Sequence, residues 1–157
     1  MKVLVVYYTR TGNAKAVAEH IAKELNADIE KIVDKKARTG VVGSASAYLR
    51  PRATTEIEEM KHNPKDYDIV IVGGPIWWFS SVPAVNAFLS NYKEQINKAA
   101  FFYSFDKDSR NRISAFPDME DFLGKSPVDT ISIESRTIKD HSFKEDIEKF
   151  VSGINTA

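Results

Sequence analysis

Apolar runs alternate along this chain with stretches in which apolar residues recur every three or four positions. The continuous runs are typical of strands that are covered on both faces of a sheet. They predict five strands, which are Lys2–Tyr8, Ile29–Val33, Tyr67–Gly73, Ala99–Phe105 and Val128–Ile133. The three-to-four spacing predicts four helices, which are Gly12–Leu25, Val82–Lys93, Phe116–Leu123 and Phe143–Ile154.

The steady alternation of strand and helix predicts an α/β fold with a parallel sheet and right-handed crossovers. We expect a single domain over residues 1–157, because this length suits one hydrophobic core. The segment Asp34–Lys65 breaks the pattern, since it mixes Gly, Ser, Arg and Pro before a weak helix near Thr55–Met60. A segment of this length with so little periodicity is more often functional or mobile than part of a core.

Composition disfavours several classes of function. Lysine plus arginine and aspartate plus glutamate both total 22, so there is no basic excess for binding nucleic acid. The chain has no cysteine, so any electron chemistry needs a bound cofactor. No apolar run approaches the roughly 20 residues that span a bilayer, and the first strand lacks the features of a signal peptide. We therefore expect a cytoplasmic protein without a membrane span, while its oligomeric state stays open.

The loop after the first predicted strand, "TRTGNA", is more polar than a plain turn requires. In open α/β sheets, ligands bind beyond the carboxyl ends of the strands. Backbone N–H groups at the start of the next helix, with two threonine hydroxyls and an asparagine amide, would suit an anion. The same residue types are also ordinary helix caps and turn formers, so the loop alone leaves phosphate binding and simple capping open.

Three consecutive aromatic residues, Trp77, Trp78 and Phe79, follow the third predicted strand. Adjacent residues cannot all point into one core. Packing of one indole in the core with the others at the sheet edge is the plain alternative. If the loop after the neighbouring strand binds a phosphate, the favoured interpretation is that these aromatic side chains enclose the planar ring of the same ligand. The residues thus point to a ligand with a phosphate and a flat ring.

Two motifs, one after the first predicted strand and one around the third, resemble those of the flavodoxin family. "TRTGNA" is similar to the flavodoxin phosphate motif, and "YDIVIVGGPIWWFSSVPAVNAFL" resembles the third-strand block of short flavodoxin-like proteins. "RTGVVGSASAYLRPRATTEIEE" is similar to a glycine-rich insert of one group of these proteins. The resemblance implies a flavodoxin-like three-layer sandwich with a five-stranded parallel sheet of order 2-1-3-4-5. It also implies FMN as the cofactor; flavodoxin is itself the standard example of FMN at this switch point.

The resemblance implies three groups of FMN-binding residues and no catalytic side chain, because the flavin carries the chemistry. The phosphate group would lie among Thr9, Arg10, Thr11, Gly12, Asn13 and Ala14. The ring and ribityl chain would run along Pro75, Ile76, Trp77, Trp78, Phe79 and Ser80. The third contact segment would be Ser104, Phe105, Asp106, Lys107 and Asp108.

Two residues and one loop depart from the family pattern. Ala14 replaces a frequent threonine, which removes one hydroxyl from the phosphate loop. Phe79 stands where relatives often have glycine, and a side chain there restricts backbone rearrangement beside the flavin. The third loop lacks the usual glycines and carries Lys107, Arg110 and Arg112, which either face the flavin or simply solvate the loop.

Charge leaves two functions open. The first is an FMN protein that transfers electrons between redox protein partners. The second is an FMN-dependent NAD(P)H oxidoreductase acting on a small quinone-like acceptor, which the neutral net charge favours because electron-carrier flavodoxins are usually acidic. A flavodoxin-like binding domain without FMN is a third, weaker alternative.

Overall fold

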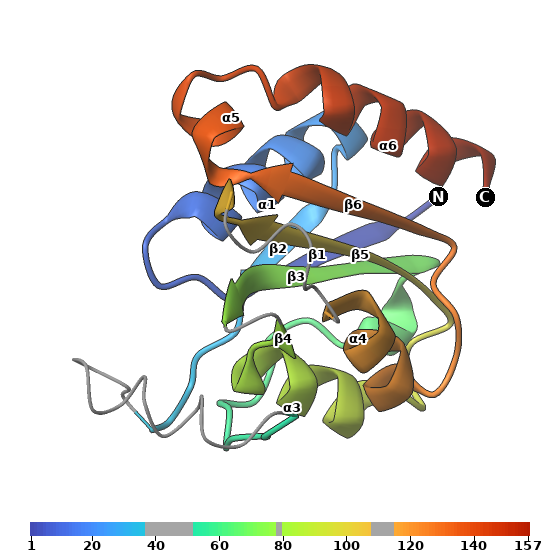
Figure 1. Ribbon diagram of the computed structural model, residues 1–157. Coiled ribbons are helices and arrows are strands. Elements are labelled where there is room, and N and C mark those ends of the chain that lie inside the picture. Colours follow the sequence, from blue (N-terminus) through green and yellow to red (C-terminus); the bar gives the residue numbers. More distant parts are fainter. Residues whose placement is uncertain (37–51, 78–79, 108–114) are drawn as a thin grey trace.

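The computed structural model describes residues 1–36, 52–77, 80–107 and 115–157. These residues form a central sheet with helices on both faces (Figure 1). The strands are β1 Val3–Tyr7, β2 Asp28–Lys31, β3 Ile69–Trp77, β4 Ser80–Ser81, β5 Lys98–Phe105 and β6 Asp129–Glu134. The helices are α1 Asn13–Leu25, η1 Pro64–Asp66, α3 Pro83–Tyr92, α4 Ala115–Leu123, α5 Ser135–Lys139 and α6 Lys144–Thr156.

Five of the strands are parallel and lie in the order β2-β1-β3-β5-β6. Numbered along the chain as parallel strands, this is the expected order 2-1-3-4-5, so the predicted topology is confirmed. In the register, Val5 of β1 lies between Ile29 of β2 and Ile71 of β3. The short β4 pairs antiparallel with the end of β3. That antiparallel pairing at the carboxyl edge was not predicted.

Alternation along each strand divides the core into two layers. In β1, Val3, Val5 and Tyr7 belong to the cluster covered by α1 and α6, whereas Leu4 and Val6 belong to the cluster covered by α3 and α4. Figure 1 shows α1, α5 and α6 on one face of the sheet and α3 and α4 on the other. The apolar runs of β1, β3 and β5 follow from this arrangement, since both faces of each strand are buried.

The weak helix predicted near Thr55–Met60 is wrong. Ile57 instead forms an antiparallel bridge with Asp34, and Glu58 N donates to Val33 O at 2.9 Å. The Glu30 carboxylate accepts hydrogen bonds from the backbone of Lys61 and His62 at 2.7 and 2.9 Å. These partners satisfy the backbone of the segment without helical bonds, and they join it to the β2 edge of the sheet.

Two other elements differ from the expectation. The third strand continues to Trp77, so it is longer than the predicted Tyr67–Gly73. The structure also has α5, a short helix that directly follows β6. Its buried Ile138 joins the α1 and α6 side of the core, and this single buried apolar position gave no helical period to detect.

Tyr67 gives a pH-dependent test of this fold. Burial, together with a 2.7 Å hydrogen bond from its hydroxyl to Asp28 Oδ2, raises the pKa of Tyr67 to about 12 from a usual 10.0. The folded state therefore keeps a proton that the unfolded state loses between pH 10 and 12. We expect the ionisation of Tyr67 to have no effect on the free energy of unfolding below pH 10. Between pH 10 and 12 it should lower that free energy. Urea unfolding of Tyr67→Phe should show a smaller fall there; parallel losses in both proteins would contradict the assignment.

Candidate functional site

The three predicted contact segments meet at the carboxyl ends of neighbouring strands. The loop after β1 joins β3 through Tyr8 N, which donates to Gly73 O at 3.0 Å. Farther along β3, Pro75 is the register partner of Ser104 in β5. Because β1, β3 and β5 are adjacent, the loops after them share one edge of the sheet. This is the edge at which open α/β folds bind ligands.

The first segment forms a left-handed turn before α1. Gly12 has φ 99° and ψ −11°, and its N–H donates to Thr9 Oγ1 at 3.0 Å. The first helical bond then runs from Ala16 N to Gly12 O. A Cβ on Gly12 would have no atom of the described chain within 4 Å, so the space beside this backbone is open. Glycine is suited to this position because other residues are strained at such φ.

This turn leaves the start of α1 suited to an anion. Gly12, the N-cap residue, has no side chain to accept from the first-turn amides, and that turn contains no acidic residue. The helix dipole places partial positive charge at the same end. Thr9 accepts through Oγ1, so its hydroxyl hydrogen can be donated elsewhere. The arrangement can bind a phosphate through backbone and hydroxyl donors.

The second segment supplies an aromatic surface beside the loop. Trp77 is half-buried at the end of β3, and its ring meets the ring of Tyr8 edge-on, with centroids 6.0 Å apart and an interplanar angle of 81°. The guanidinium carbon of Arg10 lies 5.8 Å from the Trp77 ring centroid. Ser80 pairs with Trp77, while Pro75 and Ile76 are half-buried on the same strand. Tyr8 was not predicted as a site residue, although it directly precedes the polar loop.

The third segment presents only its last described residues to solvent. Ser104 and Phe105 are buried, so contact of their side chains with a ligand would require a change in packing. Asp106 and Lys107 are exposed at the end of β5. Trp78, Phe79 and Asp108 were also predicted to contact the cofactor, and they lie outside the described residues. The binding roles of all three segments stay predictions.

Comparison with known proteins decides the family. The family model described as Flavodoxin matches residues 2–151. The chain belongs to the flavodoxin family. No curated protein matches the sequence.

Solved structures share the flavodoxin-like fold. A crystal structure from Bacteroides eggerthii aligns at TM-score 0.70 and 18% identity, covering 94% of this chain and 98% of that one. A flavoprotein from Lactobacillus acidophilus, crystallised in complex with FMN, aligns at 0.67 and 16%, covering 90% and 98%. Oxidised flavodoxin 2 from Bacillus cereus aligns at 0.64 and 19%, covering 99% of each chain. At these identities the likeness shows the fold alone.

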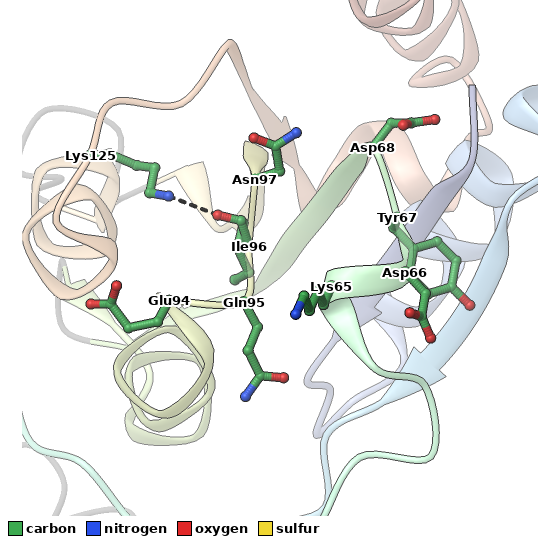
Figure 2. Close-up of a pocket in the computed structure, with 9 residues that line it drawn as sticks. All are labelled: Lys65, Asp66, Tyr67, Asp68, Glu94, Gln95, Ile96, Asn97 and Lys125. Carbon is green, nitrogen blue, oxygen red and sulfur yellow. Dashed lines mark hydrogen bonds between the residues drawn. The ribbon is translucent and has the colours of Figure 1, made fainter.

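A separate pocket lies at the opposite edge of this flavodoxin sheet (Figure 2). It has a volume of about 500 Å³ and is formed by residues that precede β3, β5 and β6, among them Tyr67, Ile96 and Lys125. Lys125 Nζ donates to Ile96 O at 2.7 Å, so this lysine is used in holding two loops together. Because the pocket is at the amino ends of the strands, it is remote from the candidate flavodoxin site.

Within the described ranges, no group of three or more His, Asp or Glu side chains is placed to bind a metal ion. Among the helices of those same ranges, none has the length and apolar character required to cross a membrane.

Proposed function

We propose that this protein binds FMN at the carboxyl edge of β1, β3 and β5 and transfers electrons between redox protein partners. The observation that carries the proposal is the open left-handed turn at Gly12, which leads into a helix without an acidic first turn. A phosphate monoester fits this backbone because its charge complements the helix end. Family membership and the FMN complex of the Lactobacillus acidophilus flavoprotein support the choice of cofactor.

The chain's own residues would divide the binding between phosphate and ring. Thr9, Thr11 and Asn13 carry side-chain donors around Gly12, and Thr9 is already oriented by the Gly12 N–H. Trp77 offers a half-buried indole held edge-on by Tyr8, and planar rings pack favourably against such a surface. Asp106 and Lys107 approach from β5. Bound FMN would supply the oxidation and reduction chemistry.

Arg10 has two possible partners at this site. Its guanidinium lies over the Trp77 ring at 5.8 Å, a geometry that stabilises both groups by about 0.5–1 kcal/mol at an exposed position. A phosphate at the Gly12 turn would offer the same side chain a charge-assisted hydrogen bond. We propose that Arg10 contributes to FMN affinity through charge while it also screens one side of Trp77 from water.

The experiment separates electron transfer from the oxidoreductase alternative. Protein loaded with FMN is mixed without oxygen with NADH or NADPH, and the visible flavin absorbance is followed with free FMN as the control. For an electron carrier we expect bleaching no faster than that of free FMN. After chemical reduction, the protein should reduce cytochrome c in a single rapid phase.

The alternative makes the opposite prediction. Bleaching by NADPH much faster than in the free FMN control, followed by reduction of a benzoquinone, would identify an NAD(P)H oxidoreductase. The exposed Lys107 and the absence of net charge are the features that favour this second function.

A further inference from the structure

Asn86 is a fully buried polar side chain on a helix that is otherwise apolar at this end. Its exposure is 0%, and it lies in the first turn of α3 among the buried residues Pro83, Ala84 and Val85. Asparagine is seldom buried so completely unless its amide is hydrogen-bonded. We therefore expect the Asn86 amide to have hydrogen-bond partners inside the protein.

Both halves of the Asn86 amide are used. Oδ1 accepts a short hydrogen bond from the Ser81 hydroxyl. Nδ2 donates to Ala53 O at 2.9 Å and to Ser81 O at 3.5 Å. One side chain thus joins α3 to β4 and to the segment that begins at residue 52.

Through β4, these bonds reach the aromatic surface of the candidate site. Ser81 is the register partner of Ile76, and Ser80 is the register partner of Trp77. Beyond Pro75, β3 therefore has β4 as its described strand partner, and β4 has only two residues. A strand so short has little stability of its own, so its position depends on the side-chain bonds that hold it.

The Ala53 end of the network is itself anchored. The neighbouring Arg52 donates from Nη1 to Asp121 Oδ2 of α4 at 2.7 Å, and its guanidinium lies 5.4 Å from the Phe122 ring centroid. Asp118 Oδ1 lies 3.5 Å from the same nitrogen. Asn86 therefore binds to a backbone carbonyl that has limited freedom to move.

We propose that Asn86 is a positioning residue that fixes Trp77 for flavin binding by holding β4 against the end of β3. It acts through Ser81 and Ser80 and does not touch the cofactor. The proposal rests on the proposed function for the identity of the ligand, while its claim about Trp77 concerns the flavin-free protein as well. Without the Asn86 amide, part of the binding free energy would be used to order this edge.

Asn86→Ala is the first test, with Tyr67→Phe as the matched control. Both changes remove side-chain hydrogen bonding from a buried residue, three bonds for Asn86 and one for Tyr67, but Tyr67 lies at the opposite edge of the sheet. We expect Asn86→Ala to bind FMN about tenfold more weakly than the native protein, equivalent to about 1.4 kcal/mol. Tyr67→Phe should bind FMN within about twofold of native although its stability is also reduced.

Tryptophan emission gives a readout that does not depend on FMN. The two tryptophans of the chain are Trp77 and Trp78, its neighbour in the sequence, so Trp77 contributes directly to the emission. In the flavin-free protein, Asn86→Ala should lower the emission anisotropy and increase quenching by acrylamide, and Tyr67→Phe should leave both unchanged. Native-like emission together with native-like FMN affinity would overturn the proposal.

Asn86→Asp tests the same claim through pH and covers the case in which the alanine variant does not fold. At neutral pH a carboxylate oxygen would face the carbonyls of Ala53 and Ser81, where the amide now donates. Burial raises the pKa of such a carboxyl, and its protonated form can donate again. We expect FMN affinity relative to native to recover as the pH falls from about 8 to about 5. A flat ratio would contradict positioning by this hydrogen bond, whereas failure of the native protein to bind FMN would reject the proposed function and leave the emission test standing.

Discussion

Replacing Gly12 with alanine should weaken FMN binding by about five- to thirtyfold. The residue has φ 99°, a conformation that costs a residue with a Cβ about 1–2 kcal/mol. In the flavin-free protein the turn can relax to relieve that strain, so binding must restore the original conformation and loses the same free energy. Isothermal titration of flavin-free protein with FMN measures the change.

Gly124→Ala is the matched control for this prediction. Gly124 also has positive φ, at 77°, and a Cβ there would likewise have nothing within 4 Å in the described structure. It follows α4, away from the loops after β1 and β3. Gly124→Ala should lose stability in urea, because a Cβ is strained at this φ, while it retains native FMN affinity. Equal affinities for the two variants would show that the Gly12 turn does not bind the cofactor.

Replacing Gly73 with alanine should lower the free energy of unfolding by about 1–3 kcal/mol or more. Gly73 lies in the middle of β3, and a Cβ there would collide with the backbone oxygen and ring of Phe102 in β5. Moving the backbone of β3 away would break hydrogen bonds, because β1 and β5 pair with β3 on both sides. Urea unfolding of the flavin-free variant measures the loss.

Gly153→Ala separates this collision from a general effect of adding a methyl group. Its Cβ would come within 2.6 Å of Asp129 Oδ2, the end of a side chain that can rotate away. Gly153 also lies inside α6, where alanine is favoured over glycine by about 1 kcal/mol. We expect Gly153→Ala to be neutral or stabilising. If Gly73→Ala proved equally mild, the close approach of β3 and β5 would be contradicted.

The alternation of strand and helix patterns was sufficient to predict five parallel strands, whereas their order came from the resemblance to the flavodoxin family. β1, β3 and β5 are each buried on both faces, so almost all of their residues are apolar and the strands can be recognised from the sequence. The turn at Gly12 was equally visible, because a glycine between threonine and asparagine before a helix is typical of a tight turn and a helix start. These features arise from local sequence, and so a local analysis finds them.

The features that were missed depend on distant partners. In Thr55–Met60 the apolar residues Ile57 and Met60 are three positions apart, which fits a helix, whereas the observed bridge of Ile57 depends on Asp34, a distant residue in the sequence. Asn86 lies four residues after Val82 and three before Leu89, within the apolar stripe of its helix. That position could have marked it as a buried polar group, but its partners Ser81 and Ala53 are known only from the fold.

The most direct measurement of the central claim is the affinity of flavin-free protein for FMN compared with riboflavin, which lacks the phosphate. Charge-assisted hydrogen bonds each contribute about 1.5–3 kcal/mol, so two or more at the Gly12 turn predict FMN binding at least about 100-fold tighter. Raising the salt concentration should reduce this preference. Equal affinity for the two flavins, or no binding of either, would contradict a phosphate site at the start of α1.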